Sequence, residues 1–178
     1  MNLKAKYSKD LIRKASSIKA IFCDVDGVLT NGRIIYDDAG YETKQFHIRD
    51  SVIIPYLKKA GVLCGIISGR ESEVVKQHAA ISGMDFCHQG ILDTLSVVEK
   101  LARHHHLKSK EVAFIGVDIN ELKVFRYAGL SVCPSDAVEY IQAEADWVTE
   151  ARGGRGVLRE VADLVLASSG VLEKILKL

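Results

Sequence analysis

Two aspartates, Asp24 and Asp26, follow a short apolar run in the stretch AIFCDVDGVLT at residues 20–30. A carboxylate held just past a buried strand could attack phosphorus as a nucleophile and form an aspartyl-phosphate. A second carboxylate two residues further on could protonate the leaving oxygen and then deprotonate a water molecule. Because the attacking carboxylate and the phosphate are both anionic, this chemistry needs a hard cation such as Mg²⁺ between them. Gly27 permits a tight turn that brings backbone N–H groups near the phosphate.

Polar residues also follow two other apolar runs. Ser68, Gly69 and Arg70 end one run, and Asp118 follows the run VAFIG. A guanidinium at Arg70 could make bidentate contacts to a carboxylate or a phosphate. Each feature also has a plainer interpretation, because an aspartate-rich turn can cap the next element and Ser68 alone would be a helix N-cap.

The elements that must position these residues alternate between strand and helix. Apolar runs and helical spacing predict strands at 19–23, 62–68, 85–88, 112–116, 130–134 and 147–149, and helices at 8–18, 51–60, 72–82, 92–105, 121–128, 137–145 and 157–167. Residues 33–48 hold two strand-like runs around Gly40, which is typical of a β-hairpin. This order predicts an α/β fold with a doubly wound, mostly parallel sheet, in which ligands bind beyond the carboxyl ends of the strands.

Composition argues against several classes of function. The chain has 178 residues and a formal net charge of +1, so it shows no overall bias towards nucleic acid or membrane surfaces. No apolar run approaches the roughly 18 residues of a membrane span. The four cysteines form no CxxC pair and are expected to be buried thiols. We therefore expect one cytoplasmic domain over 1–178 with no nucleic-acid or membrane partner.

Longer stretches resemble a known family. DVDGVLTNG at 24–32, IISGRESEVV at 66–75, HQGILD at 88–93 and GGRGVLREV at 153–161 resemble the haloacid dehalogenase superfamily. Within it they are similar to the 3-deoxy-D-manno-octulosonate 8-phosphate phosphatases and the related nonulosonate 9-phosphate phosphatases. The resemblance covers about residues 17–167. It implies a Rossmann-like domain without a large cap domain, and a place in lipopolysaccharide biosynthesis.

The resemblance also implies roles for matching residues. Asp24 would be the nucleophile, and Asp26 would be the general acid and base. Asp50, by contrast, is by spacing alone an N-cap candidate for the helix at 51–60. The implied substrate-binding or phosphate-binding residues are Gly27, Ser68, Gly69, Arg70, Asp50, His78 and Thr94, and the implied Mg²⁺ ligands are Asp24, Asp26 and Asp118.

Three positions depart from the family pattern. Thr94 stands where the related enzymes have a lysine, Val117 where they have a metal-binding aspartate, and His78 where they have an arginine. Asp118 is retained, and Glu121 replaces an outer aspartate. One hypothesis is that Asp118 moves in to replace the lost ligand, with Glu121 reaching further than the usual residue.

Two functions of different classes follow from these features. One is an active Mg²⁺-dependent phosphatase that acts on a phosphorylated acidic sugar, such as 3-deoxy-D-manno-octulosonate 8-phosphate. The other is a catalytically weak or inactive homologue that binds a sugar phosphate or serves assembly. The intact motifs at Asp24 and Ser68 favour the first, and the changes at Thr94, Val117 and His78 favour the second.

Two segments outside these motifs also have implied roles. By resemblance, the hairpin at 33–48 joins those of neighbouring subunits in a homotetramer, and a C-terminal lid segment at about 150–178 closes over a neighbour's site. The glycine-rich part of that segment, 152–156, carries two cations. Its residues alone suit either an anion-binding lid or a solvated loop.

Overall fold

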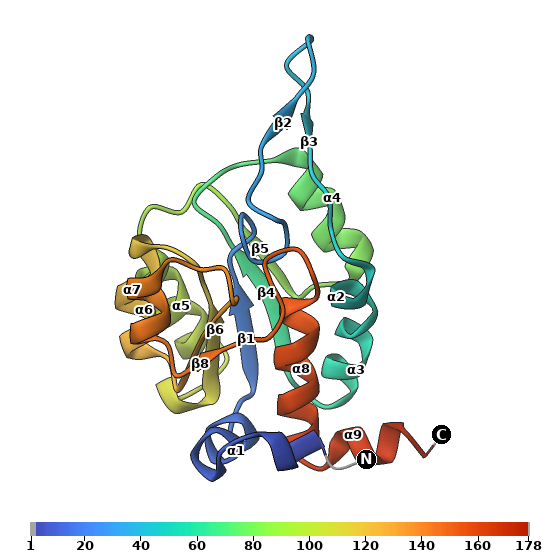
Figure 1. The fold of residues 1–178 in the computed structure, drawn as a ribbon, viewed down its shortest axis with the longest axis vertical. Helices are drawn as coiled ribbons and strands as arrows, with labels where there is room; N and C mark the ends of the chain where they lie inside the picture. The colour runs from blue at the N-terminus through green and yellow to red at the C-terminus, as the bar shows by residue number, and fades with distance from the viewer. Residues whose placement is uncertain (1–2, 178) are drawn as a thin grey trace.

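The computed structural model describes residues 3–177, and in them six parallel strands form one sheet (Figure 1). The order across the sheet is β5-β4-β1-β6-β7-β8. The bounds are β1 (Ala20–Cys23), β4 (Leu63–Ile67), β5 (Phe86–His88), β6 (Val112–Ile115), β7 (Leu130–Cys133) and β8 (Trp147–Val148). The chain builds outward from β1 in one direction and then, from β6, in the other. The point where this direction reverses, beside β1, is where such sheets bind ligands.

Two layers of helices cover the sheet. Alternate residues of β1 face opposite sides: Ile21 and Cys23 belong to one buried cluster, and Ala20 and Phe22 to the other. The first cluster contains buried residues of α1 (Lys9–Ser16), α3 (Ile54–Lys59), α4 (Glu73–Ser82) and α8 (Val157–Ser168). The second contains those of α5 (Thr94–His104), α6 (Leu122–Tyr127) and α7 (Glu139–Glu144). The predicted α/β class with a mostly parallel sheet is confirmed.

Short elements complete the described chain. They are the 3-10 helices η1 (Leu3–Lys6), η2 (Ser109–Glu111) and η3 (Ile119–Glu121), together with α2 (Ile48–Val52) and α9 (Val171–Ile175). The helix predicted at 51–60 is in fact two helices, α2 and α3, which join at Ile53. Pro55 explains the break, because it lies in the first turn of α3, where a missing N–H costs no hydrogen bond.

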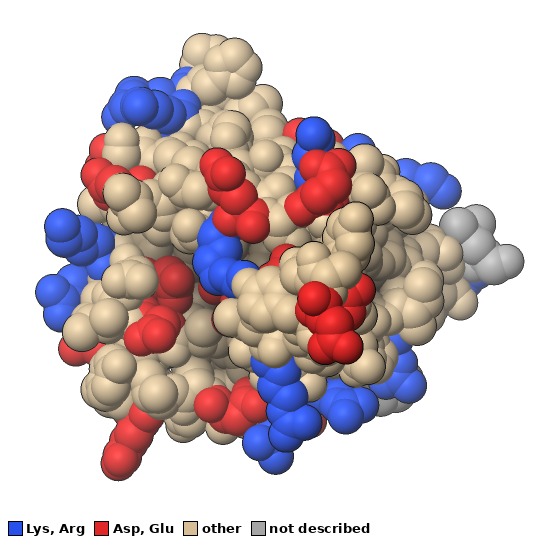
Figure 2. Space-filling model, turned by 90° about the horizontal axis from the view of Figure 1, so that it is seen from above, with Lys and Arg blue, Asp and Glu red and all other residues tan. Residues whose placement is uncertain are grey.

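The β-hairpin projects from the body of the molecule (Figure 1). Its strands β2 (Ile35–Tyr36) and β3 (Glu42–Thr43) pair antiparallel, and they are shorter than the runs predicted at 33–48. The Asp37 carboxylate holds the turn by accepting hydrogen bonds from the backbone N–H groups of Ala39 and Tyr41. Figure 2 looks down on this end of the molecule and shows acidic and basic side chains mixed over its surface.

The thiols and the lengths of the helices are two further features of the described chain. Cys23, Cys64 and Cys133 are buried free thiols, and Cys87 is a half-buried one, as the lack of a CxxC pair predicts. Every helix in the described part of the chain is too short or too polar to span a membrane.

Candidate active site

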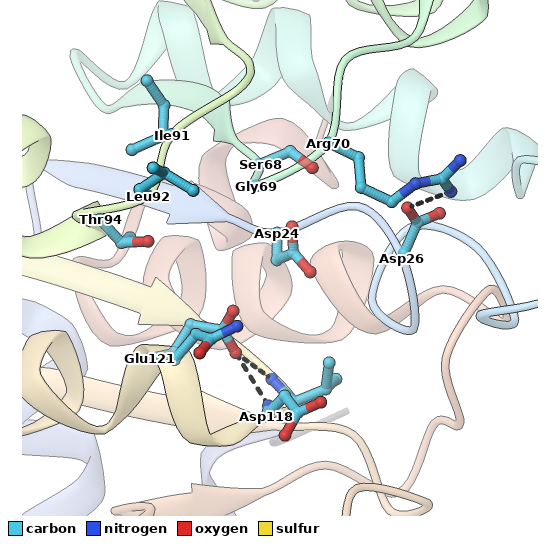
Figure 3. Close-up of a pocket in the computed structure, with 12 residues that line it drawn as sticks. Asp24, Asp26, Ser68, Gly69, Arg70, Ile91, Leu92, Thr94, Asp118 and Glu121 are labelled. Atoms are coloured by element: carbon cyan, nitrogen blue, oxygen red, sulfur yellow. Dashed lines mark hydrogen bonds and ion pairs between the residues drawn. The ribbon is translucent and has the colours of Figure 1, made fainter.

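A cavity of about 410 Å³ opens at the carboxyl ends of β1, β4 and β6. It brings together side chains that are far apart in the sequence (Figure 3). The residues predicted for the site that line it are Asp24, Asp26, Ser68, Gly69, Arg70, Thr94 and Asp118. The cavity therefore lies beyond the carboxyl ends of the strands, where the sequence predicts that a ligand binds.

The turn after β1 places the two aspartates. The backbone N–H of Asp24 donates to the carbonyl of Ile115 (3.0 Å), which extends the pairing of β1 with β6 by one residue. Gly27 has φ +97°, a conformation that favours glycine. The buried hydroxyl of Thr30 closes the turn, accepting from the backbone N–H groups of Gly27 (3.4 Å) and Gly32 (3.2 Å). No role for Thr30 was predicted from the sequence, although its place in DVDGVLT marks it as part of the turn.

Asp24 is the carboxylate at the centre of the cavity. Burial, together with the negative charge of Glu121, raises the pKa of Asp24 to about 7. The backbone N–H of Val25 and the hydroxyl of Ser68 act in the opposite direction. No lysine or arginine among residues 3–177 lies within 4.0 Å of the Asp24 carboxylate. Asp24 therefore has anionic neighbours and, in the described part of the chain, no cation to balance them.

Glu121 is the second buried acid, with 8% of its surface exposed. Its Oε2 accepts hydrogen bonds from the backbone N–H groups of Val117 and Asp118, both at 2.9 Å. The Asp118 carboxylate is exposed and caps η3 by accepting from the N–H of Ile119 (2.7 Å). Burial raises the pKa of Glu121. In this structure the acid that approaches Asp24 is Glu121, and Asp118 faces away from it (Figure 3).

These residues meet some, but not all, of the requirements for binding a hard cation such as Mg²⁺. Among residues 3–177, no three His, Cys, Asp or Glu side chains gather in a metal-binding arrangement. Asp24 and Glu121, however, are two neighbouring buried carboxylates without a balancing charge. Mg²⁺ commonly keeps several waters and takes only one or two carboxylates from a protein. Val117 supplies no oxygen and packs against Gly27, where an added Cβ would meet Val117 Cγ2 at 3.2 Å.

Asp26 is held by two cations. Its Oδ1 lies 2.5 Å from Lys44 Nζ, and its Oδ2 lies 3.1 Å from Arg70 Nη1. Glu42 contacts the same two cations, at 2.8 Å from Arg70 Nη2 and 3.3 Å from Lys44 Nζ. No role for Glu42 or Lys44 was predicted from the sequence. The available signal was their alternation in β3 and just beyond it, because residues two apart on a strand share one face.

Three residues predicted to bind substrate or phosphate do not line the cavity: Gly27, Asp50 and His78. Asp50 is 1% exposed, and its Oδ1 accepts a hydrogen bond from the N–H of Arg159 in the first turn of α8 (2.7 Å). The alternative, that Asp50 caps its own helix, is wrong, because His47 is the N-cap of α2. His78 is half-buried and stacks on Phe46, with ring centroids 3.7 Å apart.

The glycine-rich segment 152–156 packs against the turn that carries the two aspartates. The N–H of Gly154 donates to the carbonyl of Val28 (2.9 Å), and the N–H of Gly153 donates to Asp136 Oδ1 (2.9 Å). A Cβ on Gly153 would lie 2.2 Å from the carbonyl oxygen of Gly27. Within the subunit, this segment supports the proposed phosphate-binding turn by packing directly against it.

Comparison with known proteins agrees with this geometry. A family model described as haloacid dehalogenase-like hydrolase matches residues 93–161. The 3-deoxy-D-manno-octulosonate 8-phosphate phosphatase KdsC of Escherichia coli (strain K12) is 35% identical over 167 residues, 94% of this chain and 89% of that protein.

Two solved structures of the same kind superpose closely. The crystal structure of the 3-deoxy-D-manno-octulosonate 8-phosphate phosphatase from Yersinia pestis has a TM-score of 0.91 and 35% identity, and covers 94% of this chain and 90% of that one. The enzyme from Moraxella catarrhalis, in complex with a magnesium ion, a phosphate ion and a KDO molecule, has a TM-score of 0.92 and 33% identity, and covers 96% of this chain and 98% of that one. The chain belongs to the haloacid dehalogenase superfamily, in its 3-deoxy-D-manno-octulosonate 8-phosphate phosphatase family, and is a phosphoric monoester hydrolase.

Proposed function

We propose that the protein is a Mg²⁺-dependent phosphatase that hydrolyses a phosphorylated acidic sugar, such as 3-deoxy-D-manno-octulosonate 8-phosphate, through an aspartyl-phosphate. The observation that carries this proposal is the position of Asp24. Its carboxylate lies at the end of β1, at the centre of the cavity, with Ser68 beside it and no lysine or arginine of residues 3–177 in contact (Figure 3). An anionic nucleophile in that setting needs an external cation, and it then faces space for a phosphate.

Residues in and around the cavity have different roles in the proposed reaction. Asp24 attacks phosphorus while the Ser68 hydroxyl and the N–H groups of the turn at Gly27 hold the phosphoryl oxygens. Asp26, two residues on, protonates the leaving oxygen of the sugar and later takes a proton from the attacking water. Arg70 lines the same cavity and binds the acidic part of the substrate or a phosphoryl oxygen.

Mg²⁺ would neutralise Asp24 and the phosphate when they approach each other. The proposed ligands are the Asp24 carboxylate and the backbone carbonyl of Asp26. Asp118 would join them only after leaving its cap on η3. Glu121 is already buried beside Asp24, and this favours Glu121 as the second acidic neighbour of the ion.

The relatives support this proposal over an inactive homologue. The matched proteins are named as phosphatases, and the Moraxella catarrhalis enzyme was crystallised in complex with a magnesium ion and a phosphate ion. The changes at Thr94 and Val117 leave Asp24, Asp26 and Ser68 in place around one cavity. We also propose the homotetramer, because apolar side chains of the hairpin are exposed, among them Ile34 (49%), Tyr36 (59%) and Tyr41 (73%).

Phosphate release from 3-deoxy-D-manno-octulosonate 8-phosphate, measured with Mg²⁺ and with EDTA, tests the function. We expect turnover that needs Mg²⁺ and that disappears in Asp24→Asn, because an amide is a far weaker nucleophile than a carboxylate. The control is thermal unfolding, which should show that the variant is folded. Wild-type release no faster than that of Asp24→Asn, across a panel of sugar phosphates, would favour the alternative of a binding or assembly protein.

A further inference from the structure

The cavity is rich in acids. Asp24, Asp26, Asp118 and Glu121 line it, and Arg70 is the one basic side chain among residues 3–177 that does so. Thr94, which also lines it, is 9% exposed and offers a hydroxyl without charge. A phosphate monoester brings further negative charge into this space. Repulsion between these charges weakens binding and raises the barrier to attack, and it grows where burial excludes water.

Lys44 is a cation that contacts the edge of this site through Asp26, which lines the cavity. It follows strand β3 of the hairpin, and its side chain is 1% exposed. Its Nζ bridges Asp26 Oδ1 at 2.5 Å and Glu42 Oε1 at 3.3 Å. Burying a charged lysine costs free energy unless the charge is paired. The two carboxylates therefore hold the Lys44 ammonium group in one position.

Lys44 contacts Asp26, the proposed general acid and base of the reaction. Asp26 has Lys44 on one carboxylate oxygen and Arg70 on the other. The orientation of the Asp26 carboxylate is therefore set by residues outside its own turn. Thr94 lies across Asp24 from Asp26 in the close-up (Figure 3), so a cation at either position would act on the same space.

We propose that Lys44 is a positioning residue of the active site: it holds the Asp26 carboxylate and supplies the positive charge that Thr94 does not. This inference rests on the proposed function, because it assigns Lys44 a part in the same reaction. It gives the hairpin a role within its own subunit, as the carrier of a cation to the cavity. A purely structural alternative is that Lys44 only fastens the hairpin to the body.

Steady-state kinetics separate these two roles. With Mg²⁺ and 3-deoxy-D-manno-octulosonate 8-phosphate, we expect Lys44→Met to lower kcat about 100-fold, the usual size of the loss of one stabilising donor, with a smaller change in KM. Lys44→Arg should keep most of kcat because it keeps the charge. The matched control is Ser72→Ala, which removes another contact of the hairpin, the bond from Ser72 Oγ to Glu42 Oε2 (2.5 Å), and leaves Lys44 in place.

A second test moves the cation to the other side of Asp24. In the double variant Lys44→Met/Thr94→Lys, we expect kcat to recover about tenfold over Lys44→Met. If Lys44 only held the hairpin to the body of the molecule, a lysine at position 94 on α5 would not restore kcat. The assignment is overturned if Lys44→Met keeps kcat within about twofold of the wild type, if Ser72→Ala loses as much, or if the double variant recovers nothing.

Binding of inorganic phosphate in the presence of Mg²⁺, measured by calorimetry, distinguishes failure of this inference from failure of the proposed function. If the wild type binds phosphate but releases none from sugar phosphates, the proposed function fails. Lys44 keeps its role in that case if Lys44→Met weakens phosphate binding about tenfold and Thr94→Lys restores it. Equal phosphate binding by the wild type and Lys44→Met would then overturn both.

Discussion

Asp50 shows how burial and charge compete at a single residue. The carboxylate is 1% exposed, one of its oxygens accepts the N–H of Arg159, and the other, Oδ2, has no hydrogen-bond partner in the described part of the chain. Burial raises the pKa of Asp50 to about 6, although the N–H of Arg159 opposes that rise. The Asp50 carboxylate caps the first turn of α8. At neutral pH it does so as the anion, which is the form that burial disfavours.

The stability of the protein should therefore depend on pH through Asp50. The folded state binds this proton more tightly than the unfolded state, where the pKa is near 3.8, so Asp50 loses its stabilising contribution as pH rises from about 4 to 6. Asp50→Asn keeps the acceptor oxygen and does not titrate. We expect the free energy of unfolding of the variant, relative to the wild type, to rise by roughly 2 kcal/mol between pH 4 and pH 7.

Urea unfolding of both proteins at several pH values measures this difference. Asp37→Asn is a suitable control, since Asp37 is exposed and sits in the hairpin turn. A constant difference between Asp50→Asn and the wild type over this pH range would contradict the prediction.

At the level of residues, the positions of side chains in a local motif could be predicted, and contacts between distant elements could not. Asp24, Asp26 and Ser68 follow strands directly, so their positions depend only on the sheet. Asp50 and Lys44 depend on which distant element packs beside them, α8 in one case and the turn after β1 in the other. Nothing in the spacing of Asp50 indicates that its partner is Arg159.

At the level of elements, the glycine-rich segment 152–156 and the turn after β1 form one unit. Gly153 comes so close to Gly27 that no side chain fits between them. The segment also continues directly into α8, whose buried face packs in the core beside β1. A shift of this segment would therefore move the Gly27 turn, which carries the N–H groups proposed to hold the phosphate.

Gly153→Ala tests this contact. Its Cβ would lie 2.2 Å from the Gly27 carbonyl oxygen, so we expect a lower Tm and a fall in kcat/KM of about tenfold or more, as misplacement near a reacting centre produces. Gly61→Ala is the control, since nothing lies within 4 Å of that site and its φ of +72° costs only backbone strain of about 1 kcal/mol. The control should lower Tm and leave kcat/KM unchanged. Equal kinetics for the two variants would show that the segment does not support the turn.

The alternation of strands and helices also explains how far the elements could be predicted. Buried strands such as β4 and β6 are continuous apolar runs, and their bounds agree with the prediction to within about one residue. The hairpin was predicted as a hairpin, but only two residues of each arm pair. Its packing against Asp26 and Arg70 depends on ion pairs across the molecule, which the pattern of the hairpin itself does not contain.

At the level of the whole molecule, the hairpin is an extension with apolar side chains exposed to solvent. Tyr41 is 73% exposed and Ile34 is 49% exposed, while the body buries its apolar residues in two clusters on either side of the sheet. Exposed apolar groups gathered on one projection are typical of a surface that meets another protein.

The proposed homotetramer leads to a prediction for this surface. We expect Tyr41→Asp to lower the molar mass measured by light scattering after size-exclusion chromatography, because a buried, unpaired carboxylate opposes association. Leu176→Asp is the control, since Leu176 is 74% exposed and lies beyond α9, far from the hairpin (Figure 1). Its mass should equal that of the wild type. An unchanged mass for Tyr41→Asp would mean that Tyr41 has no part in assembly.

The support of the Gly27 turn by Gly153 and Gly154 has a consequence for the order in which a nascent chain becomes active. The ribosome makes Asp24, Asp26, Ser68 and Arg70 early, and the segment that buttresses their turn, together with α8, comes late. A chain interrupted before this segment would carry the proposed nucleophile and proton donor without the packing that fixes them. We therefore expect catalytic competence to appear only after synthesis has passed the glycine-rich segment 152–156 and α8.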